Sequence, residues 1–577
     1  MNFKYGIRPE TFKLTDGLYH GCNPKMIDEY DNTISLACAR NDTAAFQVIL
    51  SLDEGFTLNV GSSPYFAQKR KKTLRVAAKS ELFTKLYIES LIPDDDRLLK
   101  ADILENKSVK EYDGGSVAAI YAEVRADAFV NAGEYDITLE FYLCDMFSPE
   151  EKIGETNVTL KVYNYLFSFP DEKKFFLDLW QHNCNLARQY DVEPWSDEHF
   201  EIMENYLYSM SELGQDTVTL IMSDTPWSGQ WCHLEQRNDA NLYEYSIVKI
   251  YKEKGRFTYD FTDAQRYIDL CAEYDIEGEI SLYGLVNVWC DYWGGFDSIT
   301  PDHPDGLKLR YFDVDEGVYK YITEGKDVDA YIKAVHDYFA ETKQIDRVRV
   351  VADEPHDTAA YRRITEHIKE IAPGFVFKAA INHSEFIPEF KDTVVDYVPS
   401  LLSLSTEFDK ILEYKATMPD SRFTWYVCNN PPHPNVMVKN DLCEGLFLGV
   451  LTSYFEMDGF LRWNYTVWTD RPTEDIRYFN WPAGDLCFVY PGKDGKPMLS
   501  LRYKILKRAC DLCVLLNGYK KKFGAEAVKE LYDKVIFTKD PREFFVDGKM
   551  IDRDKLCSVE YGDYDGIRRT ILEKLSK

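Results

Sequence analysis

Apolar and polar residues alternate along several short segments of the first 166 residues. Residues 44–50 (AAFQVIL) and 135–141 (YDITLEF) are two such segments, and polar turns separate them from their neighbours. A period of two is typical of strands that bury one face. Helical periodicity is scarce here, and the alternation ends just before Phe169-Pro170. The pattern predicts an N-terminal β-sandwich over residues 1–168.

After that point, a short apolar run, a loop and an amphipathic segment follow one another repeatedly, which is typical of parallel β/α units. Eight runs are predicted strands: residues 175–180, 217–222, 278–283, 347–352, 376–381, 395–401, 423–427 and 459–463. Helices are predicted between most of them, for example at residues 197–213, 262–274, 328–343 and 358–371. Eight units predict a (β/α)8 TIM-type barrel over residues 169–518, with a long insertion at 286–326. An open, doubly wound sheet is the alternative, and it fits the strand count less well.

The end of the chain is predicted to be helical and small. Residues 499–516 have the pattern of a helix, and residues 519–577 form a lysine-rich C-terminal extension that we expect to pack on the barrel. A length of 577 residues suits such a multidomain chain, because one domain usually takes roughly 100–200 residues.

Composition narrows the class of protein. No stretch approaches the ~20 apolar residues of a membrane-spanning helix, so we expect a soluble protein. The net charge of −29 argues against nucleic-acid and membrane partners, because phosphate binding requires clustered Lys and Arg. Thirteen scattered cysteines and no visible signal peptide predict a cytoplasmic protein with reduced thiols. A secreted protein whose leader had been removed would look the same.

Motifs for several other chemistries are absent from the sequence. It has no Gly-x-Ser-x-Gly elbow, no Walker loop and no Gly-x-Gly-x-x-Gly between a strand and a helix. The histidines at strand ends, His182 and His383, lack the spacing of a metal site. We therefore expect no cofactor and no metal, and the oligomeric state is left open.

Two adjacent carboxylates, Asp353 and Glu354, end the fourth predicted strand directly before Pro355. Asp and Glu make up 97 of the 577 residues, so adjacent acids are common by chance and only position gives this pair weight. Active sites of TIM barrels lie at the C-terminal ends of the strands. The competing interpretation is a turn cap and a solvated loop residue. Two carboxyl groups at this position favour glycoside hydrolysis.

Adjacency raises a geometric problem, because neighbouring side chains of a regular strand point to opposite faces. Both can reach one sugar only if the backbone bends before Pro355. They would then lie side by side instead of flanking the anomeric carbon, which suits a substrate-assisted mechanism. In that mechanism the 2-acetamido oxygen of the substrate attacks the anomeric carbon. One carboxylate holds the acetamido N–H, and the other acts as acid and then as base.

The segments 351–355 (VADEP), 425–435 (WYVCNNPPHPN) and 459–468 (GFLRWNYTVW) occur in this order, followed by a stretch from Gly484 to Arg502. Together they resemble glycoside hydrolase family 123 and its uncharacterised relatives, over most of the chain. The resemblance implies an exo-acting, retaining β-N-acetylgalactosaminidase with substrate-assisted catalysis, acting on a glycan or glycoconjugate with a terminal amino sugar. It implies that Asp353 orients and polarises the acetamido group and that Glu354 is the general acid/base.

Polar and aromatic residues at the other strand ends are candidates for binding the sugar. They are Asp224, Tyr283, Asn382, His383, Trp425, Tyr426, Trp463, Asn464 and Trp468. Trp180, His182, Trp227 and Trp231 also lie at strand ends, where an aromatic residue can equally belong to the core. The aromatic-rich insertion at 286–326 is a further candidate for shaping specificity. Two other functions stay open: an exo-glycosidase for another sugar, and a carbohydrate-binding protein on a degenerate barrel.

Overall fold

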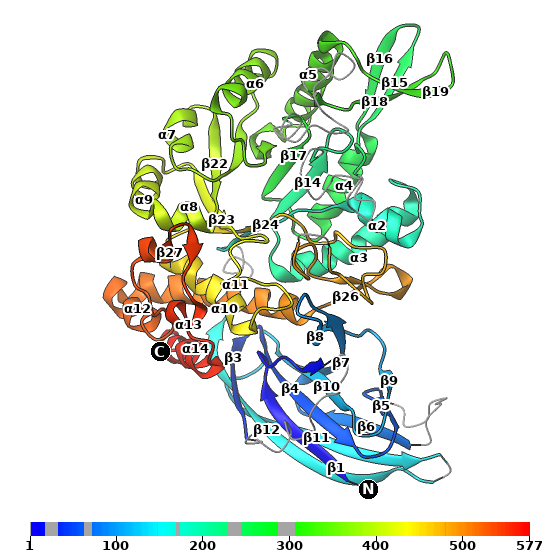
Figure 1. Cartoon of the computed structure of the whole chain (residues 1–577), viewed down its shortest axis with the longest axis vertical. Coiled ribbons are helices and arrows are strands. Elements are labelled where there is room, and N and C mark those ends of the chain that lie inside the picture. Colours follow the sequence, from blue (N-terminus) through cyan, green and yellow to red (C-terminus); the bar gives the residue numbers. More distant parts are fainter. Residues whose placement is uncertain are drawn as a thin grey trace.

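The N-terminal region of the computed structural model is built from strands (Figure 1). The structure describes residues 2–17, 33–62, 72–146, 148–168, 174–227, 244–286, 306–478 and 481–577. One six-stranded sheet has the order β1 (Phe3–Pro9), β4 (Asp42–Leu52), β10 (Val117–Ala126), β7 (Phe83–Pro93), β8 (Leu98–Leu104) and β2 (Thr15–Gly17). The other has the order β3 (Ser35–Arg40), β12 (Glu151–Leu166), β11 (Gly133–Asp145), β6 (Lys72–Lys79), β5 (Phe56–Asn59) and β9 (Val109–Tyr112).

One hydrophobic core joins these two sheets. Phe46 and Ile120 of the first sheet and Leu74 and Phe141 of the second belong to the same buried cluster. The alternation in the sequence explains this arrangement, because every second residue of β4 and β11 points into the shared core. The prediction of a β-rich N-terminal region is confirmed.

The next region is an eight-stranded parallel barrel. Its strands have the order β13 (Phe176–Leu179), β24 (Gly459–Arg462), β23 (Arg422–Tyr426), β22 (Val394–Pro399), β21 (Phe377–Ile381), β20 (Val348–Ala352), β17 (Glu279–Tyr283) and β14 (Thr217–Ile221). Every neighbouring pair in this order is parallel. The eight predicted strands are confirmed to within two residues at each end, and the ring order excludes the doubly wound alternative.

Two glutamine side chains close the ring between β13 and β14, where only one isolated parallel bridge, Leu177 to Gln215, joins the backbones. The Gln215 amide accepts from Leu179 N (2.9 Å) and donates to Leu179 O (3.1 Å) and Thr217 O (2.8 Å). Gln181 likewise bonds Leu179 O and Thr219 N. Both glutamines are buried, so their amides replace backbone partners at this seam.

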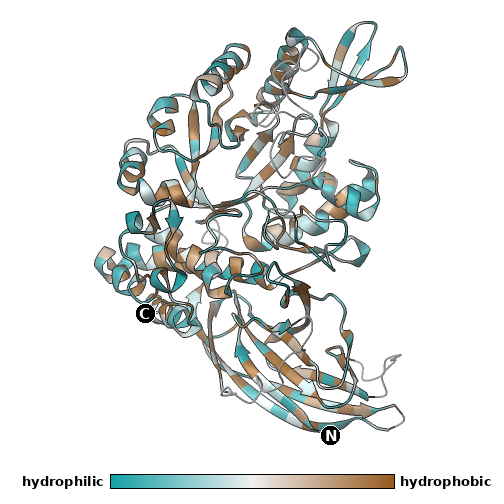
Figure 2. Cartoon of the chain, viewed as in Figure 1, coloured by the Kyte–Doolittle hydropathy of each residue, from teal (hydrophilic) through white to brown (hydrophobic). Residues whose placement is uncertain are grey.

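The helices surround the barrel and continue beyond it, with their hydrophobic sides turned inward (Figure 2). They are α2 (Asn183–Tyr190), α3 (Asp197–Leu213), α4 (Thr262–Glu273), α5 (Gly325–Glu341), α6 (Thr358–Ile371), α7 (Phe386–Phe390), α8 (Leu401–Thr406), α9 (Phe408–Thr417), α10 (Leu442–Tyr454), α11 (Leu501–Phe523), α12 (Ala525–Tyr532), α13 (Arg553–Leu556) and α14 (Tyr561–Leu575). The expected boundary at residue 518 falls inside α11. In the part of the chain that the structure describes, none of these helices combines the length and apolar character needed to cross a bilayer.

An inserted four-stranded sheet extends from one side of the barrel, at the upper right of Figure 1. Its order is β16 (Arg256–Asp260), β15 (Lys249–Glu253), β18 (Arg310–Asp313) and β19 (Val318–Tyr321). The sequence pattern predicted the insertion at 286–326 but missed β15 and β16, which precede the third barrel strand. Residues 287–305 of the insertion, with their aromatic side chains, lie outside the described residues.

Buried ion pairs connect α11 to the first N-terminal sheet. The Arg502 guanidinium donates to both oxygens of Asp102 in β8, and the Tyr490 hydroxyl donates to the same carboxylate. Arg508, further along α11, pairs with Glu10 and Asp42. These groups are buried, so the barrel and the N-terminal sheets hold one another through charge-assisted bonds.

Side chains fill the barrel interior in two layers. The layer at the C-terminal ends of the strands takes one residue from each strand, or the residue directly after it, and all eight are buried. They are Trp180, Ile221, Tyr283, Val351, Ala380, Val398, Tyr426 and Leu461. The barrel is therefore a packed core whose upper layer forms the floor of the mouth.

The second layer is charged, and its residues precede those of the first layer by two positions on β13 and β21 and by four on β17. Lys378 Nζ donates to Asp178 and to Glu279 (2.7 Å), and all three residues are buried. Arg422 extends the network from the other oxygen of Glu279. Burying ions costs several kcal/mol each, so the network is stable only while the charges stay paired.

Lys378→Met should lower the free energy of unfolding by about 3–5 kcal/mol, because it leaves Asp178 and one oxygen of Glu279 buried without a cation. Urea unfolding measures the difference. Lys521→Met, which removes an exposed charge from α11, is the control and should change stability little. Equal stability of the two variants would contradict the inferred role of Lys378.

Candidate active site

The carboxylates Asp353 and Glu354 follow β20 at the C-terminal mouth of the barrel, and both are half-buried. Side chains alternate along β20, and Val351 points into the interior layer. Asp353 is two residues further and continues the interior series. It lines a small cavity together with Trp227, Tyr283 and Val351.

Glu354 would point toward the helices if the strand continued regularly. Its backbone instead adopts a left-handed conformation, with φ of 51°, which is uncommon for a residue other than glycine. This turn lets its side chain meet Tyr426, whose hydroxyl is hydrogen-bonded to Glu354 Oε1. Tyr426 belongs to the interior layer, so the contact places Glu354 on the same side as Asp353. The bend that the sequence required is therefore located at Glu354 itself.

A short chain of polar groups continues from Glu354. The Tyr426 oxygen also lies 3.1 Å from Asn382 Oδ1, at the end of β21. Burial, and then the nearby Glu354 carboxylate, raise the pKa of the Tyr426 hydroxyl well above its ordinary value, so the phenol stays protonated. A phenol has a single hydrogen. The hydroxyl can therefore donate to either Glu354 or Asn382, and it connects these two side chains at the mouth.

Aromatic rings form the wall on the Asp353 side of the mouth. Trp180 stacks on Trp227 with ring centroids 5.6 Å apart, and Tyr283 contacts both rings at 4.8 and 5.2 Å. The indole N–H of Trp180 is buried without a hydrogen-bond partner among the described residues. All three rings are buried, so they support the floor of the mouth beside Asp353.

His182 lies between Trp227 and Trp463, with ring centroids 4.7 Å and 6.5 Å away. His182 Nε2 lies 3.0 Å from the carbonyl oxygen of Trp463, and burial lowers the pKa of His182 to about 4, so the ring is neutral and Nε2–H donates. Its other nitrogen lies 3.9 Å from Glu244, a buried acid that the sequence analysis did not identify. Burial raises the pKa of Glu244 to about 7. Glu244 also accepts from Asn185 (2.9 Å) and from the backbone N–H of Cys184, which fixes the start of α2.

Of the nine predicted binding residues, four lie at the mouth and five have other surroundings. Tyr283, Asn382, Tyr426 and Trp463 lie at the mouth with the two carboxylates. Trp425 instead points to the helices, where its indole N–H donates to Thr452 of α10 (2.9 Å). Trp468 donates to Val489 O (2.8 Å) and packs against Tyr206 of α3.

Asp224 and Asn464 are both buried, in different settings. The Asp224 carboxylate pairs with Arg310 of the inserted sheet at 3.0 Å and accepts from Ser246 N at 2.9 Å, so it holds the insertion. Asn464 follows Trp463 out of register with the interior series. Neither polar atom of its side chain has a hydrogen-bond partner among the described residues. Trp231, another strand-end candidate, lies outside them.

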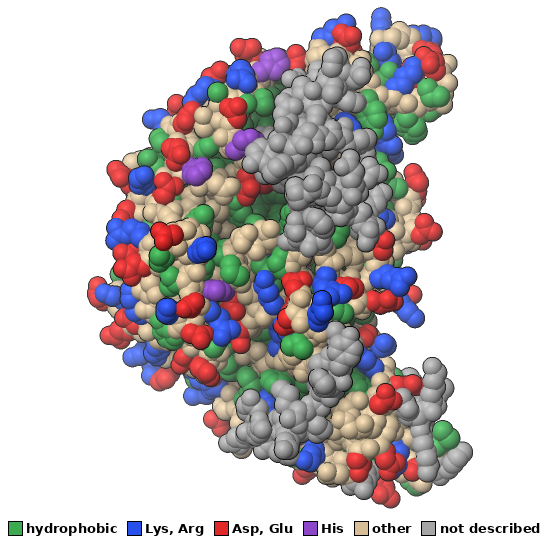
Figure 3. All heavy atoms as spheres, in the orientation of Figure 1, with side chains coloured by type: hydrophobic (Ala, Val, Ile, Leu, Met, Phe, Trp, Pro, Cys, Tyr) green, Lys and Arg blue, Asp and Glu red, His purple; other side chains and the backbone are tan. Residues whose placement is uncertain are grey.

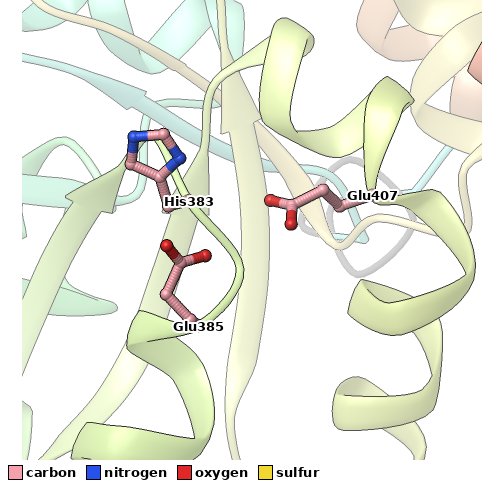
Figure 4. Close-up of side chains that lie close together, drawn as sticks. All are labelled: His383, Glu385 and Glu407. Carbon is pink, nitrogen blue, oxygen red and sulfur yellow. The ribbon is translucent and has the colours of Figure 1, made fainter.

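His383 lies at the rim, beside Glu385 and Glu407, and the three side chains point toward one another (Figure 4). One possible ligand atom from each lies within 4.8 Å of the others. His383 and Glu385 are exposed, and Glu407 already accepts a hydrogen bond from Ser384 N (2.8 Å). Exposed acidic groups of this kind are common without an ion, so we assign no metal to the cluster.

Carboxyl groups set beside aromatic rings at the mouth of a parallel barrel are typical of glycoside hydrolases. The comparison with family models identifies the kind. The model of the glycoside hydrolase 123 catalytic domain matches residues 180–517, and the chain belongs to glycoside hydrolase family 123. The family resemblance drawn from the sequence motifs is thus confirmed, and so is glycoside hydrolase activity as the class of reaction.

One solved structure shares the fold of the whole chain. A family 123 glycoside hydrolase from Clostridium perfringens, described in a structural analysis of glycolipid glycan hydrolysis, superposes with a TM-score of 0.74. The match covers 100% of this chain and 97% of that one at 15% identity, so it establishes the fold alone. A maltogenic α-amylase from Thermotoga neapolitana reaches a TM-score of only 0.29 at 10% identity, covering 59% of this chain and 77% of its own. A search of curated proteins found no match.

Tyr426→Phe should lower kcat/KM for glycoside hydrolysis about 100-fold, because Glu354 loses the hydroxyl that holds its side chain in the mouth. Steady-state kinetics measure the loss. Tyr397→Phe removes a hydroxyl from the neighbouring strand β22, where it bonds Ile387 O on the helix side, and should keep activity within about twofold. A similar loss in both variants would show that the effect is structural.

Proposed function

We propose that this chain is an exo-acting, retaining β-N-acetylgalactosaminidase that uses the 2-acetamido group of its substrate as the nucleophile. The observation that carries the proposal is the side-by-side placement of Asp353 and Glu354. Two carboxyl groups that flank a sugar can supply both an acid and a nucleophile. Two carboxyl groups on consecutive residues reach the sugar from the same side. The nucleophile then has to come from another group, and the 2-acetamido oxygen of the substrate can supply it.

In the proposed first step, the acetamido oxygen attacks the anomeric carbon while Glu354 donates its proton to the departing glycosidic oxygen. Asp353 accepts the acetamido N–H and stabilises the positive charge of the oxazolinium intermediate. In the second step, Glu354 removes a proton from water, which attacks the anomeric carbon and restores the acetamido group. Two inversions retain the β configuration.

The surroundings of the two acids support these roles. The Tyr426 hydroxyl is hydrogen-bonded to Glu354 Oε1 and holds this carboxyl group at the mouth, where a general acid can reach the glycosidic oxygen. In the ring order, β24 lies opposite β20, so Trp463 faces the carboxylates across the mouth. A sugar between them would have an aromatic ring on the side away from the acids.

We propose a glycan or glycoconjugate with a terminal β-linked amino sugar as the substrate. The similar enzyme from Clostridium perfringens is described as hydrolysing glycolipid glycans, which supports the glycan of a glycolipid as one form of it. Tyr283, Asn382, Tyr426 and Trp463 are the proposed contacts with the sugar.

Glu354→Gln should lower kcat/KM by about 10²–10⁴-fold on substrates with poor leaving groups, since proton donation is lost. Nitrophenyl glycosides, whose leaving group needs little protonation, should lose much less in the first step. Glu385→Gln makes the same change at an exposed position on the next strand end and should leave kcat/KM unchanged. Wild-type turnover by Glu354→Gln would remove Glu354 from the role.

Asp353→Asn should lower activity on 2-acetamido substrates at least about 100-fold, because the developing oxazolinium loses its anionic partner. A thiazoline analogue of this intermediate should inhibit the wild-type enzyme and bind the variant much more weakly. Full activity of the variant would contradict the assignment of Asp353, and indifference of the wild type to the thiazoline would contradict the substrate-assisted mechanism.

A panel of aryl β-glycosides that differ at C2 and C4 tests the sugar itself. We expect turnover of the 2-acetamido galacto compound and little turnover of the matched compound with a hydroxyl at C2, because only the first carries a nucleophile. Preference for the gluco over the galacto configuration would correct the sugar. Turnover of the C2 hydroxyl compound at the same rate would favour an exo-glycosidase of another mechanism.

A further inference from the structure

A wide groove separates the N-terminal sheets from the barrel. Its volume is about 1920 Å³, and none of the residues that line it belongs to the catalytic mouth described above. One wall is formed by β7, β8 and β10. The other is formed by α3, the hairpin of β25 (Tyr490–Pro491) and β26 (Pro497–Met498), and the first turns of α11. A groove of this volume can hold several sugar units.

The groove is positively charged although the protein is acidic. Ten Lys and Arg residues line it against six Asp and Glu, in a chain whose net charge is −29. Three of the ten, Arg125, Lys507 and Arg508, are paired with carboxylates outside the lining. Figure 3 shows Lys and Arg side chains among acidic ones at the level where the barrel meets the N-terminal sheets. A local reversal of sign inside an acidic surface attracts compact anions and concentrates them there.

Several of these cations are not neutralised by neighbours. Lys504 is paired with Glu123 at 2.6 Å, whereas Lys85, Lys493 and Lys496 are exposed and pair with no carboxylate among the described residues. Their ammonium groups come from both walls, since Lys85 is on β7 and the other two flank the β25–β26 turn. An anion in the groove would therefore meet unpaired positive charge on two sides.

Aromatic rings accompany the lysines on both walls. Phe83 of β7 is 64% exposed and Tyr208 of α3 is 56% exposed, values that are unusual for such side chains. Deeper in the groove, the ring of Tyr87 has Lys85 Nζ 4.5 Å and Lys504 Nζ 5.2 Å from its centroid. Aromatic faces pack against the C–H faces of sugars, and ammonium groups bind sulfates and carboxylates.

We propose that this groove is a second glycan-binding site, which takes a short anionic oligosaccharide carrying sulfate or carboxylate groups. The exposed rings supply contacts that a simple inorganic anion would not use. The overall charge of −29 disfavours a long polyanion such as nucleic acid, most of which would lie outside the groove. The site therefore adds recognition of an acidic glycan segment to the hydrolysis carried out at the barrel mouth.

Calorimetric titration of the full chain tests the site, with three tetrasaccharides that carry no 2-acetamido group and so avoid the proposed catalytic subsite. They are sulfated maltotetraose, tetragalacturonate and unmodified maltotetraose. We expect at least one anionic compound to bind, with an affinity that falls as salt rises, and maltotetraose to bind at least about tenfold more weakly. The tighter of the two anionic compounds identifies sulfate or carboxylate as the recognised group.

Two kinds of variant locate the binding. Lys493→Glu combined with Lys496→Glu should lower the affinity for the anionic compound at least about tenfold. Tyr208→Ala should also lower this affinity, because the aromatic contact with the sugar is lost. Lys521→Glu combined with Lys529→Glu makes the same charge change at exposed positions outside the groove. This control pair should leave the affinity for the anionic compound unchanged. All variants should hydrolyse a simple aryl glycoside at the wild-type rate. Absence of anion binding, equal binding of maltotetraose, or equal weakening by the control pair would overturn the proposal.

Discussion

A side chain on a barrel strand faces either the interior or the surrounding helices, and this alternation determines the composition of the site. The interior series begins with the charged network of Asp178, Glu279 and Lys378. It then passes to the buried layer that contains Val351 and Tyr426. Asp353 is the next member of the series on β20, so it reaches the mouth without distortion. The closed ring makes this possible, because it gives every strand the same interior.

Glu354 is the exception, and its backbone accounts for it. A left-handed conformation of a residue other than glycine costs of order 1–3 kcal/mol and persists where the surroundings hold it. The hydrogen bond from Tyr426 and the buried Pro355 that follows are such surroundings. The strain converts two residues that would face apart into a pair on one side of the mouth. A local backbone angle thus decides which chemistry the barrel supports.

Much of this architecture could be predicted from the sequence, because the buried parallel strands are continuous apolar runs and the acid pair ends one of them. The same alternation could have sorted the binding residues further. Trp425 and Tyr426 are neighbours on β23, so only one of them can face the interior. His383 and Asn464 are likewise out of register with Asn382 and Trp463.

Other parts depend on contacts between distant segments, which local patterns do not contain. The sequence offered Asp224 as a candidate for binding the sugar because it follows a predicted barrel strand. Its ion pair with Arg310 could not be foreseen, since Arg310 lies in an inserted sheet with no strong periodicity. Glu244 carries no signal at all, since a buried acid in a loop has the same sequence pattern as an exposed one. Its place beside His182 follows only from how the loops pack.

The glutamine seam between β13 and β14 has a consequence for how the barrel is assembled. The first strand forms a regular backbone ladder only with β24, which lies nearly half the chain further on, while its other edge is held by the amides of Gln181 and Gln215. During synthesis, β13 therefore waits for the last strand before its backbone is paired, and barrel closure is a late, non-local event. Trp180, directly after β13, takes its final place only when β24 has paired with β13. Most of the barrel sequence has therefore left the ribosome before a complete sugar site can form.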